Sequence, residues 1–263
     1  LMADPDLPAK ARRGETDDIR PCLRCLACFS HLITNGQIHC AVNPEIGRER
    51  ECIRRPESSG VKTVLVAGGG IGGMETAIEA AKKGHRVILC EKSGELGGAL
   101  KCEKNVPFKK KIRAYIEYQI KELEKSGADI RLNTSVTPEL ADSISPDVIV
   151  AALGAVPYMP EIPGIHGKNV FTAEDIYHDP AKAGGTVTVL GGGLVGTELA
   201  IYLAGLNKKV TIIERLPALN SGGNILHQFA LDREIALRGI DLCLGSEVRE
   251  ILSDGVIIET GEI

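Results

Sequence analysis

Residues 61–73 read VKTVLVAGGGIGG, a short apolar run that leads directly into a cluster of glycines. The apolar run predicts a buried strand, and the residues after it predict a helix over 72–83. The glycines match the spacing G-x-G-x-x-G. In that pattern Gly68 allows a tight turn, Gly70 lets the backbone approach a pyrophosphate, and Gly73 lets the helix pack closely on the strand. The stretch therefore predicts an α/β unit that binds a dinucleotide.

The residues around this motif agree with that interpretation. The next expected strand, residues 86–90, ends at Glu91, near the ~20-residue distance at which a carboxylate binds ribose hydroxyls. Lys92 follows it directly. Ile71 and Gly72 open the helix, where free N–H groups and the helix dipole favour phosphates. These residues complete the first predicted nucleotide site.

The same order of elements returns later in the chain. Residues 187–190 predict a strand, a second glycine cluster follows, and residues 194–203 predict a helix. The next strand, 210–213, ends at Glu214, which favours NAD(H) because a carboxylate repels the 2′-phosphate of NADP(H). Arg215 could reverse that preference, and a vestigial site that binds ADP or nothing is the alternative. The expected site residues are Gly191, Gly193, Leu194, Val195, Gly196, Glu214 and Arg215.

Four of the eight cysteines are crowded into the pattern C-x2-C-x2-C-x11-C. They are Cys22, Cys25, Cys28 and Cys40. Four thiolates at such spacing favour a 4Fe–4S cluster, whereas structural zinc usually takes two separated C-x-x-C pairs. The other four cysteines are dispersed and offer no redox-active pair, which argues against a flavin disulfide reductase.

Composition narrows the class of protein. Hydrophobic residues make up 43%, charged residues 25%, and the net charge is −4, as in ordinary globular proteins. No basic stripe or Trp suggests nucleic-acid binding, and no apolar run approaches the ~20 residues of a membrane helix. Residues 1–20 are polar and do not resemble a signal peptide, so we expect a reducing, cytoplasmic location.

The predicted fold class is α/β, with two dinucleotide-binding domains behind an irregular, cysteine-rich segment. We expect the segment over residues 1–60, the first domain over 61–160 and the second over 161–263. A long amphipathic helix is predicted over 107–126, and the Pro- and Gly-rich residues 158–167 predict a linker.

Together these motifs resemble the C-terminal part of the multidomain NADH:flavin oxidoreductases, the family of 2,4-dienoyl-CoA reductase and trimethylamine dehydrogenase. The resemblance runs through residues 3–11, 19–44, 68–98 and 147–154 to the second glycine motif, and so covers essentially the whole chain. It implies Rossmann-like FAD and NAD(P) domains of the glutathione-reductase type. It also implies electron flow from NAD(P)H through FAD and a 4Fe–4S cluster to FMN on a barrel domain, which reduces an activated C=C bond such as that of an enoyl- or dienoyl-CoA.

The resemblance adds residues to the FAD site. Glu95 to Gly98 and Leu100 would lie beside the flavin nucleotide, Val136 would contact adenine through its backbone, and the turn at residues 152–154 would close the site, with Leu153 in place of the usual threonine. The added residues are Gly97, Gly98, Leu100, Val136, Ala152 and Gly154.

The resemblance further implies that the FMN barrel precedes residue 1 and that the FAD domain is completed after residue 263. We therefore expect that this polypeptide alone does not catalyse the parent reaction, and we nominate no catalytic residue. The expected partners are a nicotinamide nucleotide and the barrel domain, with self-association left open. Two other functions remain: a non-catalytic zinc- and ADP-binding module, and an NADPH-fed input subunit like that of glutamate synthase.

Overall fold

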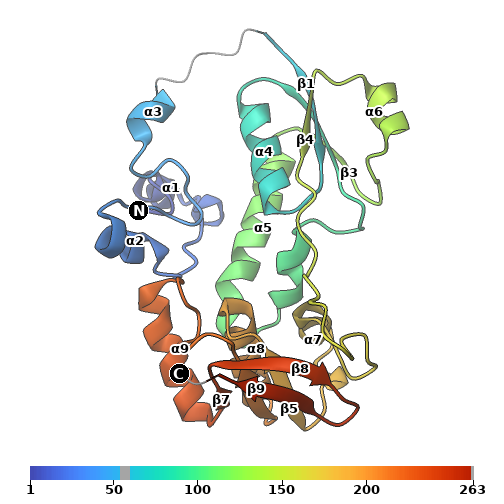
Figure 1. The fold of residues 1–263 in the computed structure, drawn as a ribbon. Coiled ribbons are helices and arrows are strands. Elements are labelled where there is room, and N and C mark those ends of the chain that lie inside the picture. Colours follow the sequence, from blue (N-terminus) through green and yellow to red (C-terminus); the bar gives the residue numbers. More distant parts are fainter. Residues whose placement is uncertain (54–59, 262–263) are drawn as a thin grey trace. The chain divides into compact units, whose positions relative to one another are not determined.

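The computed structural model describes residues 1–53 and 60–261 and divides the chain into two compact units (Figure 1). The first unit contains Leu1–Arg24 and Gln37–Val156, and the second contains Cys25–Gly36 and Pro157–Ile263. Each unit holds one of the two predicted strand–glycine–helix sequences. The three domain boundaries expected from the sequence stay a prediction.

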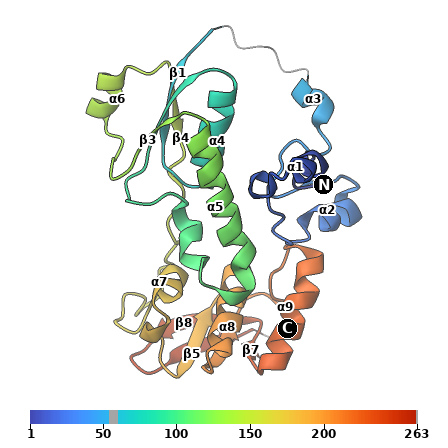
Figure 2. The ribbon, with the colours of Figure 1, turned by 180° about the vertical axis from the view of Figure 1, so that it is seen from behind.

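The first unit is built on a parallel sheet with the strand order β3-β2-β1-β4. Its strands are β1 (Thr63–Ala67), β2 (Arg86–Cys90), β3 (Asp129–Arg131) and β4 (Val148–Ala151). Helices α4 (Ile71–Lys82) and α5 (Lys110–Lys125) lie side by side over one face (Figure 2). Helix α6 (Pro138–Ile144) packs on the other. Because both faces are covered, β1 and β2 are almost uniformly apolar, as parallel strands usually are.

Alternate strand residues face the two layers. Val64 and Val66 pack toward α4, together with Leu123 of α5. Leu65 packs toward α6 with Ile88. This alternation follows from the period of two residues in a β-strand.

Helix α5 confirms the predicted amphipathic helix and adds a second buried face. Ile116 and Leu123 are buried, as the apolar periodicity predicts. Tyr115 and Tyr118 are also buried, in a cluster with Ala3 near the N-terminus. The expected helix start at residue 107 is instead a 3₁₀ turn (Pro107–Lys109), which leads into α5.

The segment predicted to be irregular contains three short helices within residues 1–53, and its residues 54–59 lie outside the described residues. Helices α1 (Leu7–Arg13) and α3 (Glu49–Ile53) lie in the first unit, and α2 (Ala27–Asn35) lies in the second. Helices α1 and α2 each end at a glycine in the left-handed conformation, Gly14 and Gly36. These helices are short and bury little apolar surface, so they leave no clear hydrophobic period in the sequence.

A buried carboxylate holds the N-terminal segment together. Asp4 is 3% exposed and accepts hydrogen bonds from Lys10 Nζ and the Arg20 N–H, both at 2.8 Å, and from the Asp6 N–H at 2.9 Å. The Arg20 side chain in turn donates to the carbonyl oxygen of Val42 at 2.9 Å. Burial alone would raise the pKa of Asp4, but the hydrogen bonds outweigh it and leave the pKa below its usual value.

A second, exposed contact joins this segment to α5. Asp18 Oδ1 forms ion pairs with Lys121 Nζ at 2.7 Å and with Lys125 Nζ at 2.6 Å, and the two lysines lie one turn apart on the helix. The two ammonium groups lower the pKa of Asp18 to about 2.

The second unit has a parallel sheet with the order β5-β6-β7 and a separate antiparallel hairpin, β8-β9. Its strands are β5 (Thr186–Leu190), β6 (Lys209–Ile213), β7 (Asp241–Cys243), β8 (Ser246–Ile251) and β9 (Val256–Thr260). Its helices are α7 (Ala173–His178), α8 (Leu194–Gly205) and α9 (Ile225–Arg238). Helix α9 packs against both α8 and α2, and Asn224 at its start donates to the carbonyl oxygen of Cys25 at 2.7 Å.

Among the described residues, no helix combines the length and apolar character that crossing a membrane requires.

We predict that Asp4→Asn lowers the free energy of unfolding by about 2 kcal/mol at pH 7, because a neutral amide replaces a charged acceptor of three hydrogen bonds. Since the folded-state pKa of Asp4 is lowered, its stabilisation is fully present above the unfolded-state value of 3.8 and is lost as the pH falls below it. Urea denaturation followed by circular dichroism measures both effects.

Asp6→Asn is the matched control, because the Asp6 side chain makes no capping hydrogen bond at the start of α1. It should change stability by less than about 0.5 kcal/mol. Equal effects of the two substitutions would contradict the central role of Asp4.

Candidate functional site

The first glycine motif forms a tight turn between β1 and α4. The Gly68 N–H donates to the carbonyl oxygen of Cys90 at 2.8 Å, and the Gly69 N–H donates to Glu91 Oε2 at 2.7 Å. Gly70 is extended and stands directly before the first residue of α4. The turn is thus tied to the end of β2, and the free N–H groups of the helix face the same edge of the sheet.

Packing inside the protein restricts three of these glycines, and backbone atoms stand in the way at two of them, Gly68 and Gly73. Gly68 has a φ of +110°, and a Cβ there would overlap the carbonyl oxygen of Ala152. A Cβ at Gly73 would overlap the carbonyl oxygen of Gly68. A Cβ at Gly69 would stand 2.5 Å from the side chain of Leu96. Packing alone explains these glycines.

Packing does not explain Gly70. Its φ of −74° and ψ of −180° suit any residue, and a Cβ would meet only Gly98 Cα, at 3.7 Å. The space beside Gly70 is therefore open and stands at the start of a helix, where a pyrophosphate would bind. Gly97 and Gly98 adopt φ values of +112° and +59°: the Gly97 N–H donates to the carbonyl oxygen of Gly69 at 2.8 Å, and Gly98 lies against Gly70. The arrangement fits a dinucleotide.

Glu91 is the buried carboxylate of this site, with 7% exposure. Its Oε2 accepts from Gly69, and its Oε1 accepts from the N–H and the hydroxyl of Ser93, both at 2.8 Å. Burial acts to raise the pKa of Glu91, but these hydrogen bonds outweigh it and leave the pKa lowered. The group is thus ionised at neutral pH, and a carboxylate has lone pairs left for ribose hydroxyls.

The second motif repeats this geometry. The Gly191 N–H donates to the carbonyl oxygen of Ile213 at 2.9 Å, and the Gly192 N–H donates to Glu214 Oε2 at 2.7 Å. The Leu216 N–H donates to Glu214 Oε1 at 2.8 Å, as Ser93 does in the first copy. The sequence repeat therefore corresponds to a repeat in three dimensions.

The pattern of required and unrequired glycines is also repeated. A Cβ at Gly196 would overlap the carbonyl oxygen of Gly191, and one at Gly192 would overlap the side chain of Leu219. A Cβ at Gly193 would meet nothing within 4 Å. Gly193 is therefore the counterpart of Gly70 and leaves the same open space.

The remaining predicted residues surround these two turns. Ile71 and Gly72 form the first turn of α4, and Leu194 and Val195 form the exposed first turn of α8. Lys92 and Arg215 each follow the site carboxylate and are exposed.

In the first unit, Leu100 is 37% exposed within a 3₁₀ helix (Gly98–Glu103), and Val136 packs against the α6 face of the sheet. The Ala152 N–H donates to the Ala67 carbonyl oxygen at 2.9 Å, and Gly154 has a φ of +73°.

Sequence reasoning gave no role to Ser93 or Leu219, and it placed Leu96 beside the FAD only through the family resemblance. Leu96 and Leu219 cover the second glycine of each motif, and Ser93 orients Glu91. The only available signal was the identical spacing of the two leucines from their glycine motifs.

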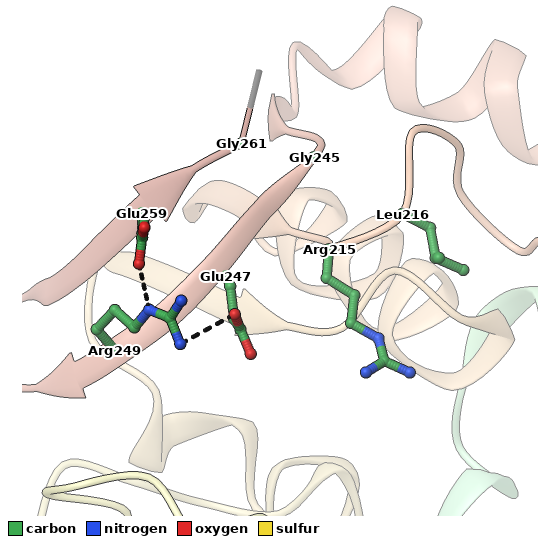
Figure 3. A pocket seen from close by; sticks show the side chains of 7 residues that line it. All are labelled: Arg215, Leu216, Gly245, Glu247, Arg249, Glu259 and Gly261. Carbon is green, nitrogen blue, oxygen red and sulfur yellow. Dashed lines mark hydrogen bonds and ion pairs between the residues drawn. The ribbon is translucent and has the colours of Figure 1, made fainter. Parts of the chain in front are cut away.

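The described part of the second unit contains a hollow of about 330 Å³ that is lined in part by Arg215, the residue after Glu214. Figure 3 shows the residues that line it. Its lining comes from the residues after β6 and from the β8-β9 hairpin. It is formed by Arg215, Leu216, Gly245, Glu247, Arg249, Glu259 and Gly261.

The four motif cysteines are distributed over both units: Cys22 and Cys40 belong to the first, and Cys25 and Cys28 belong to the second. All four are free thiols, and Cys22 Sγ accepts the Arg24 N–H at 3.4 Å. Arg24 and Leu26 have φ values of 59° and 57°. Within residues 1–53 and 60–261, no group of three or more His, Cys, Asp or Glu side chains is gathered as a metal site. The cysteine thiols suit a soft metal ion or an iron–sulfur cluster, and the 4Fe–4S cluster stays a prediction.

We predict that Gly70→Ala and Gly193→Ala change the free energy of unfolding by less than about 0.5 kcal/mol, because both positions are open and extended. Gly73→Ala and Gly196→Ala should each cost about 2 kcal/mol or more, because the new methyl group overlaps a backbone carbonyl. Thermal unfolding of the nucleotide-free protein distinguishes the pairs. Equal losses at all four positions would contradict the assignment of open and closed glycines.

Curated relatives match nearly the whole chain. An NADH oxidase of Thermoanaerobacter brockii is 37% identical over 97% of this chain and 40% of its own length. A cinnamate reductase of Clostridium sporogenes is 35% identical over 99% of this chain and 39% of its own length. The chain thus spans about two fifths of the length of these relatives.

A solved structure of 2-naphthoyl-CoA reductase superimposes with a TM-score of 0.92 at 33% identity, over 98% of this chain and 40% of that one. The expected resemblance to the multidomain NADH:flavin oxidoreductases and the predicted α/β fold class are confirmed. The family model described as pyridine nucleotide-disulphide oxidoreductase matches residues 62–262, and the chain belongs to this family.

Proposed function

We propose that this chain is the electron-transfer part of an NADH:flavin oxidoreductase. In the whole protein, reducing equivalents would pass from NADH through FAD and a 4Fe–4S cluster to FMN on a barrel domain, which reduces an activated C=C bond such as that of an enoyl- or dienoyl-CoA. The observation that carries the proposal is the repeated cradle: two turns with the same hydrogen bonds, each with open space beside the glycine that stands directly before the helix, Gly70 or Gly193.

We assign FAD to the first cradle and NADH to the second. The first cradle has an additional backbone wall at Gly97 and Gly98, which lies beside Gly70 and lengthens the surface available to a dinucleotide. The second cradle carries Glu214 in a position to accept ribose hydroxyls.

The cysteine motif completes the proposal. A bound flavin accepts a hydride from a nicotinamide and releases electrons singly, and a 4Fe–4S cluster carries one electron at a time. The N–H of Arg24 already points at Cys22 Sγ, and such hydrogen bonds to ligand sulfurs tune a cluster's potential. Because thiolate ligands must stay reduced, we place the protein in the cytoplasm.

This function requires no acid or base from the chain. The residues of both cradles bind and orient nucleotides, and hydride transfer between two aligned rings depends on position. The NADH oxidase and cinnamate reductase relatives are about two and a half times as long as this chain, so the barrel, its FMN and the final acceptor belong to the proposal for the whole protein.

Metal analysis of anaerobically purified protein tests the cluster. We expect iron and acid-labile sulfide in equal amounts, with a broad visible absorption that bleaches with dithionite. Cys22→Ser and Cys40→Ser should lose iron, whereas Cys243→Ser, at the end of β7 in the second unit, should retain it. Zinc in place of iron after reconstitution would favour a non-catalytic module that binds zinc and ADP.

We predict that Gly70→Ala weakens FAD binding at least about tenfold, because the new methyl group occupies the space that a pyrophosphate needs. Flavin retained after ultrafiltration measures the change.

Gly14→Ala is the matched control: it also adds a methyl group in open space, and it lies at the C-terminal cap of α1. It should leave flavin content unchanged even if it lowers stability. Normal FAD binding by Gly70→Ala would exclude the first cradle as the flavin site.

A further inference from the structure

The hollow beside Glu214 is lined by two arginines and two glutamates. Arg249 lies on β8 between two carboxylates: its Nη1 is 3.0 Å from Glu247 Oε2, and its Nε is 2.6 Å from Glu259 Oε2. Arg215 also lines the hollow, from the residues after β6 (Figure 3). Two guanidinium groups thus border one hollow, and one of them is held in two ion pairs.

The internal repeat shows which part of a dinucleotide this hollow adjoins. In the first cradle the Thr134 N–H donates to the carbonyl oxygen of Glu91, and in the second the Ser246 N–H donates to that of Glu214. The residues after Ser246 are therefore the counterparts of those after Thr134. Because they start beside the carboxylate that binds ribose hydroxyls, they border the adenosine end of the nucleotide.

The charges differ between the two copies at this place. The three positions after Thr134 carry the neutral residues Ser135, Val136 and Thr137, whereas those after Ser246 carry Glu247, Val248 and Arg249. A flavin nucleotide never carries a 2′-phosphate on its adenosine, but nicotinamide nucleotides exist with and without one. The charged hairpin thus occurs only where the choice between two nucleotides arises.

We propose that Glu247 and Glu259 are specificity-determining residues that keep the second cradle selective for NADH. By pairing with Arg249 they prevent it from joining Arg215 in a two-guanidinium site for a 2′-phosphate. Together with Glu214 they also give the charged groups around the hollow a net negative balance, which repels a phosphate dianion. This inference rests on the proposed function of the second cradle.

The ion pairs suit this role because they are exposed. The side chains of Arg249, Glu247 and Glu259 are 52%, 56% and 64% exposed. Exposed pairs contribute little to folding stability and are screened by salt. Removing the carboxylates should therefore leave the fold intact and change only the electrostatic potential at the hollow.

The test uses the full 263-residue chain and titration calorimetry with NADH and with NADPH at low ionic strength. The wild type should prefer NADH. Glu247→Gln with Glu259→Gln should raise NADPH affinity at least about fivefold and leave NADH affinity nearly unchanged. The gain should shrink in high salt and vanish when Arg249→Gln is added.

Glu234→Gln is the matched control, since Glu234 pairs with Arg238 on α9 of the same unit. It should leave both affinities unchanged. Three results would overturn the role of the hairpin while the nucleotide site stands. These are an unchanged ratio of NADH to NADPH affinity in the double variant, a gain in NADPH affinity that survives Arg249→Gln, and a wild type that prefers NADPH. Binding of neither nucleotide by the wild type would overturn the proposed function itself.

Discussion

One hydrogen bond organises each half of this protein: the N–H of the second glycine donates to the carboxylate that ends the following strand. It measures 2.7 Å both from Gly69 to Glu91 and from Gly192 to Glu214. The contact fixes the turn against the neighbouring strand and uses a charged acceptor, which makes it stronger than a bond between neutral groups. It also places the carboxylate at the carboxyl edge of the sheet, where ligands bind in open α/β folds. A leucine, Leu96 or Leu219, closes the turn from behind.

The turns were predictable from sequence because every part of them is local. Strand, glycines, helix and carboxylate follow one another within about thirty residues, and each leaves its own mark in composition or spacing. Leu96 and Leu219 leave only the weaker signal of their equal spacing from the two glycine motifs, since a single leucine in a loop forms no pattern by itself. The helices near the N-terminus were missed for a related reason: Asp4 and its three donors, rather than a buried apolar stripe, hold that segment in place.

The two halves diverge where their ligands are expected to diverge. Both keep the glycine turn, the carboxylate and the leucine. They differ after the third strand of each sheet, where the first unit continues through Val136 into α6 and the second forms a charged hairpin. The repeat thus keeps the turn at the start of the helix and varies the residues after the third strand. Sequence motifs predicted the two glycine turns and their carboxylates, whereas the contact between Arg249 and Glu259 leaves no local pattern because it forms only through the pairing of β8 with β9.

The loop that carries the first motif cysteines contains two residues in a strained backbone conformation. Arg24 and Leu26 flank Cys25 in the left-handed conformation, which costs a residue with a Cβ roughly 1 kcal/mol or more. Such strain persists only where surrounding contacts determine it. Here the Arg24 N–H binds Cys22 Sγ, the Leu26 carbonyl oxygen accepts the first N–H groups of α2, and the Cys25 carbonyl oxygen accepts Asn224. These hydrogen bonds, made within the protein, hold the backbone on both sides of Cys25 in a defined conformation.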